Sequence, residues 1–343
     1  MAAFVPLAKP DLTGNERKYL LEAFDSGYLS HQGKFEDLFE QEFGKWIGRP
    51  AIATSSGTGA LHIALLSLGV GRGDECILPS LTFGATASVV VAVGARPVFV
   101  DVDPETWGLN WKHVRSKVNR RTRAVLSVHL YGEDCGIEDV GVPVIEDACE
   151  GLGMVPVRGH CAAYSFYGNK PLSTGEGGML VGNLGNARLY RDGGFTSDYD
   201  QVVAGLNYRM TNLQAAVGLA QLERIDELVG KRLKNAERYR QALKGKGKWL
   251  FVAECPNPVS LGAHLRANGI DSRPVFRPLH LTQAFRTDGK FRHSEEIWTH
   301  GLCLPTGPHL TEQEQQRICE LVTQHLREPA DSAPKRAASL RSF

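Results

Sequence analysis

The sequence lacks several features that would direct its interpretation elsewhere. It has no excess of either charge, because 39 Lys and Arg residues are balanced by 38 Asp and Glu residues, for a net charge of +1. Nothing in this balance favours binding to nucleic acid or to an anionic membrane. The N-terminus does not show basic residues followed by an apolar stretch, the pattern of a signal peptide. Even the β-branched run at 88–94 is far too short to cross a bilayer. We therefore expect a soluble protein with no nucleic-acid or membrane partner.

The cysteines lack a pattern as well. There are seven of them, and no two form a Cys-x-x-Cys pair, which fits neither a zinc site nor a disulfide framework. Reduced thiols in the cytoplasm are the simplest interpretation, and we predict no metal site. The Gly-rich segment 69–73 follows a predicted helix and precedes a predicted strand, which is the wrong order for a dinucleotide-binding turn. A nicotinamide site is excluded on that basis.

What the chain does have is length and alternation. With 343 residues and 42% hydrophobic content, it can bury a large core. From residue 51 onward, short apolar strands alternate with helical stretches, which is typical of an α/β fold whose mainly parallel sheet is covered on both faces. Such sheets bind ligands at the carboxyl ends of their strands. Strands are predicted at 51–53, 75–78, 97–100, 124–128, 142–146, 161–167 and 178–182.

Helices are predicted before and after this alternating region. The capping-box spacing, Thr-x-x-Glu or Thr-x-x-Gln, occurs at Thr13 and at Thr211, and each precedes apolar residues at helical intervals. Beyond residue 245 the pattern indicates an α+β unit, with a strand at 249–252 and helices at 258–268 and 311–326. We predict a large domain at 1–243, a smaller C-terminal α+β domain at 244–328 and a flexible tail at 329–343.

Two residues suggest the chemistry. Lys170 stands at the end of an apolar run in a glycine-rich segment, and Asp147 follows the apolar run 142–145, so both should lie at carboxyl ends of strands. An amine and a carboxylate at two such ends suit pyridoxal phosphate, whose aldehyde needs a Schiff-base lysine and whose ring nitrogen needs an acidic partner. Taken alone, Lys170 could be an ordinary loop lysine and Asp147 a helix N-cap.

A candidate phosphate site lies earlier in the chain. Residues 55–61 follow a strand and open an apolar helix, so the backbone N–H groups of Gly57 and Thr58 and the positive end of the helix dipole could hold a phosphate. Short turns of this composition also occur for packing reasons alone, and the presence of Asp147 and Lys170 favours the phosphate. An ATP-binding loop at 168–171 does not fit, because no glycine immediately precedes Lys170 and a proline follows it.

Four separated motifs occur in order along the chain: Ser56-Gly57-Thr58, Asp147-Ala148, the run 165–178 around Gly168-Asn169-Lys170, and the run 207–216. Their order and spacing resemble those of the sugar-nucleotide aminotransferases, the DegT/DnrJ/EryC1/StrS family, over roughly residues 5–325. The resemblance implies fold type I of the pyridoxal phosphate-dependent transferases, the aspartate aminotransferase-like fold. It further implies a large, mostly parallel sheet domain with a smaller C-terminal α+β domain.

The resemblance also implies roles for particular residues. Lys170 would bind the aldehyde of pyridoxal 5'-phosphate and then serve as the base, and Asp147 would keep the ring nitrogen protonated. Phe83 matches the aromatic residue that stacks on the cofactor, and Ser165 matches the phosphate-binding serine. Asn207 matches an asparagine that reaches the phosphate in the neighbouring subunit, which implies a homodimer with shared active sites.

Glu150 points to a subgroup, because many relatives have glutamine or histidine there, and we count it among the cofactor-binding residues. Glutamate at this place resembles the subgroup that makes GDP-perosamine for surface polysaccharide such as O-antigen. The implied substrate is GDP-4-keto-6-deoxy-mannose, aminated at C4 with L-glutamate as donor. Enzymes that act on UDP- or dTDP-linked keto sugars have similar motifs, so the base of the nucleotide stays open. As substrate contacts we predict Gln32, Arg277 and His280, each of which could equally be an ordinary surface residue.

Other functions stay open at this point. Relatives that carry out pyridoxamine-dependent deoxygenation typically have histidine where this chain has Lys170, so lysine favours amino transfer. A non-catalytic regulatory member would retain the fold but would have no need for a mobile base. The chain also departs from the family pattern between Gly136 and Pro143, where relatives have a longer helical segment.

Overall fold

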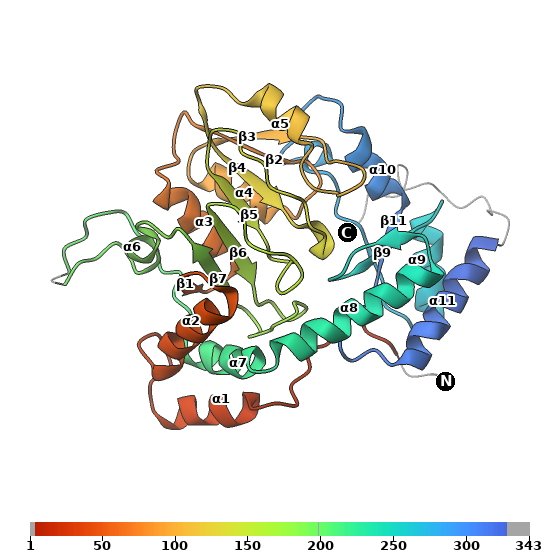
Figure 1. Cartoon of the computed structure of the whole chain (residues 1–343), viewed down its shortest axis with the longest axis horizontal. Helices are drawn as coiled ribbons and strands as arrows, with labels where there is room; N and C mark the ends of the chain where they lie inside the picture. The colour runs from red at the N-terminus through yellow and green to blue at the C-terminus, as the bar shows by residue number, and fades with distance from the viewer. Residues whose placement is uncertain (1–3, 198, 328–343) are drawn as a thin grey trace.

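A seven-stranded sheet forms the centre of the larger part of the molecule in the computed structural model, which describes residues 4–197 and 199–327 (Figure 1). Its strand order is β1-β7-β6-β5-β4-β2-β3. The five strands from β6 to β3 are mutually parallel, whereas β7 is antiparallel to both β6 and β1. The predicted mostly parallel α/β sheet is confirmed. The strands are β1 (Ala51–Thr54), β2 (Glu75–Pro79), β3 (Arg96–Val100), β4 (Thr122–Val128), β5 (Val144–Asp147), β6 (Cys161–Ser165) and β7 (Gly178–Gly182).

Helices cover both faces of this sheet because successive side chains of each strand point to opposite sides. Ala163 packs in the core cluster beneath α3 and α4, whereas its neighbours Ala162 and Tyr164 pack against α2 and α7. Both faces are therefore apolar, as buried parallel strands require. The helices of this part are α1 (Glu16–Asp25), α2 (Lys34–Ile47), α3 (Gly57–Ser67), α4 (Ala85–Ala92), α5 (Trp111–Lys117), α6 (Ala187–Arg191) and α7 (Asn212–Leu222), with the 3-10 turn η1 (Leu130–Gly132).

The long helix α8 (Ile225–Ala242) runs from the large sheet to a second, four-stranded antiparallel sheet of order β10-β11-β9-β8 (Figure 1). The core beside this sheet includes Val5, Tyr239 and Leu243, which precede the predicted domain boundary. That boundary stays a prediction, and the predicted tail 329–343 lies outside the described residues. The remaining elements are β8 (Gly245–Lys246), β9 (Phe251–Glu254), α9 (Pro258–Ala267), β10 (Arg273–Pro274), η2 (Leu279–Leu281), α10 (Arg292–His300), β11 (Gly301–Leu304) and α11 (Glu312–Arg327).

Two local predictions are wrong and one is confirmed. The capping box at Thr211 is present, with side-chain bonds in both directions. The one at Thr13 is not, because the Thr13 hydroxyl donates to Asp11 at 2.6 Å and α1 begins after Asn15 without a side-chain cap. The strand predicted from Trp249 begins only at Phe251. Residues 133–143 contain no helix or strand.

None of the helices that the structure describes is both long enough and apolar enough to cross a membrane. The described residues contain no cluster of three or more His, Cys, Asp or Glu side chains that could hold a metal ion.

Candidate active site

A cavity of about 460 Å³ opens where the central strands of the large sheet end, facing the small sheet. Its floor comes from the segments that follow β1, β2, β4, β5 and β6, and Trp249, Arg273 and Cys303 contribute the opposite wall. Seven of the residues predicted from the sequence line this one cavity: Gly57, Thr58, Phe83, Asp147, Glu150, Ser165 and Lys170.

Asp147 is the last residue of β5, between β4 and β6. Its carboxylate is nearly buried, accepts a hydrogen bond from the Thr86 hydroxyl at 2.7 Å and accepts another from the Cys149 N–H at 3.3 Å. These bonds orient the carboxylate before any ligand arrives. No helix begins within residues 148–160, so Asp147 is not a helix N-cap.

Lys170 lies in the loop between β6 and β7, where its N–H donates to the Tyr167 carbonyl at 2.9 Å. Its Nζ lies 3.7 Å from the centre of the Trp249 ring and 3.6 Å from Oε1 of Glu150. An ammonium group over an indole face is attracted by the ring quadrupole, and a carboxylate at this distance adds a second attraction. The amine is therefore placed at a defined point of the cavity wall.

Glu150 is buried beside this amine. Its Oε2 accepts a hydrogen bond from the Tyr131 N–H at 2.7 Å, which leaves Oε1 toward Lys170. Burial raises the pKa of the Glu150 carboxyl to about 7, although the positive charge of Lys170 opposes the shift. A carboxyl that titrates near neutral pH can hold or release a proton under working conditions.

The first turn of α3 forms a cradle for an anion. The Ser56 hydroxyl caps this 11-residue helix by accepting from the Gly59 N–H at 3.0 Å, which leaves the N–H groups of Gly57 and Thr58 at the cavity. A Cβ at Gly57 would stand 2.6 Å from Sγ of Cys149, so only glycine fits here. The Ser165 side chain lines the same part of the site.

An aromatic surface completes the cavity. Phe83 is 60% exposed, although it is a large apolar ring, and its centre lies 5.6 Å from that of Phe276. Phe276 in turn stacks on the buried Tyr131 at 5.4 Å. An exposed ring at a cavity wall offers a face to a flat ligand. An amine, a fixed carboxylate, an anion cradle and this ring together fit pyridoxal phosphate.

The structure does not bring four predicted residues to this cavity: Gln32, Asn207, Arg277 and His280. His280 is buried, with Nδ1 2.5 Å from the Ser80 hydroxyl and its ring stacked on Phe291 at 4.1 Å. The Arg277 guanidinium lies 5.8 Å from the centre of the Trp298 ring. His280 and Arg277 therefore contact other protein side chains and do not line the cavity.

Gln32 and Asn207 also lie outside the cavity, and each has a distinct backbone conformation or pairing. Gln32 has a positive φ of 72° and donates its N–H to the Glu36 carboxylate at 3.1 Å. Asn207 forms an isolated bridge with Asp192 beside α6. Substrate contact by Gln32, and a role for Asn207 in a second subunit, stay predictions.

Several residues of the site were missed from the sequence: Thr86, Tyr131, Trp249, Arg273 and Phe276. Thr86 stands in the segment that supplied Phe83, but its bond to Asp147 joins residues 61 positions apart. The sequence pattern predicts Trp249 as the first residue of a strand. Because tryptophan is common in strands, the sequence carried no signal that this ring would face a lysine.

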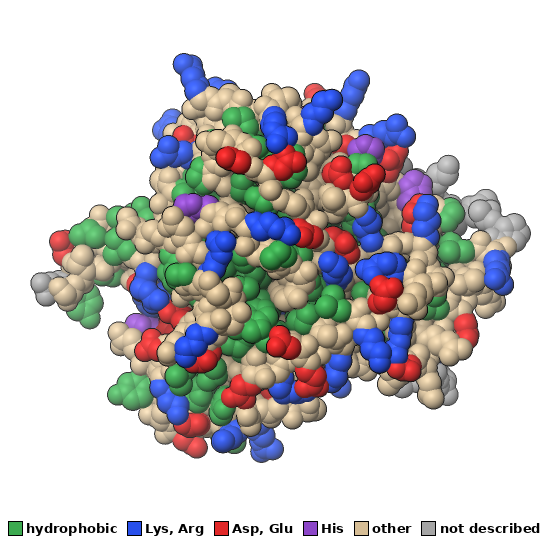
Figure 2. Space-filling view, viewed as in Figure 1, with side chains coloured by type: hydrophobic (Ala, Val, Ile, Leu, Met, Phe, Trp, Pro, Cys, Tyr) green, Lys and Arg blue, Asp and Glu red, His purple; other side chains and the backbone are tan. Residues whose placement is uncertain are grey.

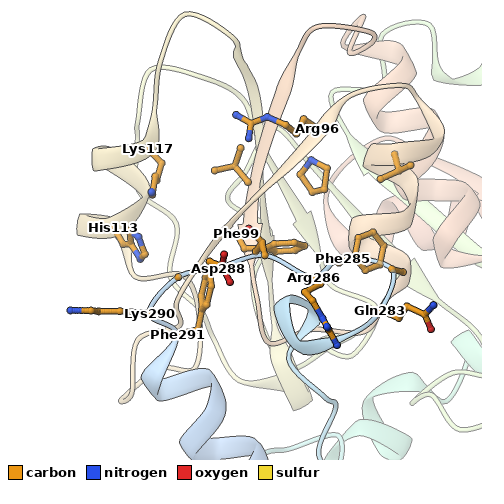
Figure 3. A pocket seen from close by; sticks show the side chains of 16 residues that line it. Arg96, Phe99, His113, Lys117, Gln283, Phe285, Arg286, Asp288, Lys290 and Phe291 are labelled. Atoms are coloured by element: carbon orange, nitrogen blue, oxygen red, sulfur yellow. The ribbon is translucent and has the colours of Figure 1, made fainter.

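A second cavity of about 610 Å³ lies at the β3 edge of the large sheet, between α5 and the segment 283–291 (Figure 3). It contains none of the predicted residues. The view shows Arg286 and Lys290 directed away from the aromatic side chains of Phe99 and Phe285. Arg286 and Lys290 therefore do not converge on a common point. The first cavity, which holds seven of the predicted residues, is the candidate active site.

Comparison with known proteins agrees with this geometry. The model of the DegT/DnrJ/EryC1/StrS aminotransferase family matches residues 10–323. The chain belongs to this family. Among its curated relatives is a GDP-perosamine synthase of Caulobacter vibrioides, which is 38% identical over 94% of this chain and 98% of the relative. EpsN of Bacillus subtilis, named as a pyridoxal phosphate-dependent aminotransferase, is 33% identical over 92% of this chain and 94% of its own length.

Solved structures of the DegT/DnrJ/EryC1/StrS family have the same fold. The crystal structure of a member from Brucella abortus is 30% identical, superposes with a TM-score of 0.85, and covers 92% of this chain and 96% of its own. Fold type I is thereby confirmed. The chain is a sugar aminotransferase that uses pyridoxal phosphate as its cofactor.

Proposed function

We propose that this enzyme transfers an amino group from L-glutamate to C4 of GDP-4-keto-6-deoxy-mannose, giving GDP-perosamine, in the cytoplasm. The observation that carries the proposal is Glu150. It lines the cavity with Asp147 and Lys170, in a chain 38% identical to a GDP-perosamine synthase over nearly its whole length. Glutamate in place of glutamine or histidine is the feature by which the sequence resembles this subgroup.

The residues of the cavity suit the cofactor part by part. Pyridoxal phosphate supplies an aldehyde that accepts amines and a ring that takes up the electrons of a broken C–H bond. Asp147 would hold the ring nitrogen protonated, and Phe83 would cover one face of the ring. The N–H groups of Gly57 and Thr58, with the Ser165 hydroxyl, would bind the phosphate.

The chain's own part in amino transfer is to move a proton, and we assign this to Lys170. Its amine would remove a proton from the donor carbon that becomes a ketone and, in the second half-reaction, would deliver a proton to the sugar carbon that becomes an amine. Trp249 and Glu150 hold this amine at 3.7 Å and 3.6 Å, respectively. Burial raises the pKa of the Glu150 carboxyl to about 7. This carboxyl can therefore take up or supply the proton between the two half-reactions.

The test uses purified protein with pyridoxal phosphate, L-glutamate and three keto sugars, linked to GDP, UDP or dTDP. We expect 2-oxoglutarate and an amino sugar with the GDP substrate, detected by mass spectrometry, and neither product with Lys170→Ala. Turnover only with a UDP- or dTDP-linked sugar would move the assignment to the alternative substrates. A deoxygenated sugar without an amine, or cofactor binding without turnover of any substrate, would contradict amino transfer.

We further propose that the working unit is a homodimer in which Asn207 completes the partner's site. Asn207 does not line its own cavity, and it forms a bridge with Asp192, which directly follows α6. The chain beside α6 projects from the body as an arm (Figure 1). Exposed hydrophobic side chains lie on this arm and over α1, where Figure 2 shows them at the surface. They are Leu20, Leu21, Phe24, Tyr28, Phe195, Tyr199, Val202 and Leu206. Apolar surface of this extent favours burial against a second copy.

Mixing two inactive variants tests the shared site. In a heterodimer of Lys170→Ala and Asn207→Ala subunits, one site carries both changes and the other carries neither. A random mixture should therefore recover about a quarter of wild-type activity. No recovery, with heterodimers shown by native mass spectrometry, would place Asn207 outside the partner's site.

A further inference from the structure

An arginine of α8 lies completely inside the protein. Arg232 is only 1% exposed, which makes it the largest of the fully buried side chains in the described part of the chain. Arginine is almost never buried to this degree unless its charge is paired. Its position therefore needs an explanation beyond the amphipathic pattern of the helix.

Among the residues that the structure describes, no carboxylate pairs with this guanidinium. Burial lowers the pKa of Arg232 to about 10, and no negative charge among its described neighbours offsets this shift. Its Nε also has no hydrogen-bond partner within the described ranges. A cation buried without a counter-ion is costly to the fold, because nothing repays its lost hydration except the groups it contacts.

Those groups are backbone carbonyls at the active site. Nη2 donates to the carbonyls of Asn169 and Lys170 at 3.2 and 3.3 Å, and Nη1 donates to that of Trp249 at 3.3 Å. The Trp249 indole N–H donates to the same Asn169 carbonyl at 2.9 Å. Arg232 thus joins the loop that carries Lys170 to the residue whose ring lies under its amine.

We propose that Arg232 is a positioning residue for Lys170, which it holds against Trp249 through these three carbonyls. The proposal rests on the function proposed above, because it gives Lys170 the reacting amine. The planar fork of a guanidinium can serve three acceptors at once from within a wall of the cavity, whereas a lysine ammonium is a compact point charge. Without this clamp, the loop retains the Lys170 N–H bond to Tyr167 and the indole bond from Trp249 to Asn169. It loses the guanidinium bonds to the carbonyls of Asn169 and Lys170.

The test compares Arg232→Met with Arg232→Lys, using Arg240→Met as the matched control. Arg240 is on the same helix, but it is partly exposed and pairs with Glu237 on the surface. The first readout is hydrogen–deuterium exchange of peptides covering 167–175 in the full chain freed of cofactor. We expect exchange at Lys170 to become about tenfold faster in Arg232→Met, since a charged hydrogen-bond set is lost. Arg232→Lys should be intermediate, and Arg240→Met should match the wild type.

The second readout separates positioning from substrate binding. Misplacing the amine should lower kcat about 100-fold in Arg232→Met, since a displacement of about 1 Å has effects of this size. The KM for the nucleotide sugar should stay within about twofold, because no substrate-facing side chain changes. Arg232→Lys should recover part of the lost kcat.

The outcomes are distinct. Unchanged exchange at 167–175 in Arg232→Met, or an increase spread evenly over all peptides, overturns the clamp. If Arg232→Met does not fold, Arg232→Lys decides alone, since faster exchange confined to 167–175 supports the clamp and unchanged exchange refutes it. The exchange experiment needs no turnover. A wild type without aminotransferase activity would therefore defeat the proposed function while leaving the clamp measurable.

Discussion

Replacing Glu150 by glutamine should make the free energy of unfolding of the cofactor-free protein fall less as the pH rises. Burial raises the pKa of this carboxyl from its ordinary 4.5 to about 7 in the folded chain. The folded state therefore keeps a proton that the unfolded state has already released. Stability from this group is fully present below pH 4.5 and is lost as the pH rises through 7.

The size of the effect follows from the shift. Each unit of pKa difference corresponds to about 1.4 kcal/mol, so the group should cost the wild type about 3 kcal/mol between pH 4.5 and pH 8. Glutamine has the same shape and cannot ionise, so it can still accept the Tyr131 N–H bond. The variant should lack this part of the pH dependence.

Urea unfolding at 25 °C, followed by circular dichroism across this pH range, measures the difference. Glu176→Gln is the control, because Glu176 also lines the cavity but is exposed. Its unfolding profile should parallel that of the wild type. Parallel profiles for wild type and Glu150→Gln would refute the reasoning, since they would mean that Glu150 ionises in the folded chain as easily as in the unfolded one.

Three further substitutions probe the site. Gly57→Ala places a Cβ 2.6 Å from Sγ of Cys149, so it should cost about 1–3 kcal/mol in urea unfolding and weaken pyridoxal phosphate binding, as measured by absorbance titration; unchanged cofactor affinity would contradict the cradle. Asp147→Asn keeps the shape but loses the charge, so kcat should fall at least about 100-fold while the cofactor still binds; a wild-type kcat would contradict its role. Trp249→Phe keeps the ring but loses the indole N–H bond to Asn169, so thermal unfolding should show a loss of about 1 kcal/mol, and no loss would show that the bond adds nothing.

Features carried by local patterns could be predicted from the sequence. The strand before Asp147, the glycine turn at Gly57 and the loop of Lys170 each combine an apolar run with a polar residue at its end. Their meeting at one cavity follows from the rule that parallel strands end at the same edge of a sheet. Seven of the predicted residues therefore line the cavity together.

Features that depend on distant pairing could not be predicted. Arg232 looks like a charged residue on an amphipathic helix, and its bond to the Lys170 carbonyl joins positions 62 residues apart. His280 was predicted to contact substrate because of its motif, but the fold gives it Ser80, 200 residues away, as a buried partner. Tertiary packing decides which partner a polar side chain has. Local patterns in one sequence do not reveal such pairings between distant residues.

The path of α8 has a consequence for inhibition. Its buried guanidinium bonds to carbonyls on both sides of the gap between the two sheets, so the spacing of those sheets is mechanically linked to the reactive amine. On the proposed role of Arg232, a compound that changed the spacing of the two sheets would displace the amine of Lys170 and lower activity without occupying the site of either substrate or of pyridoxal phosphate.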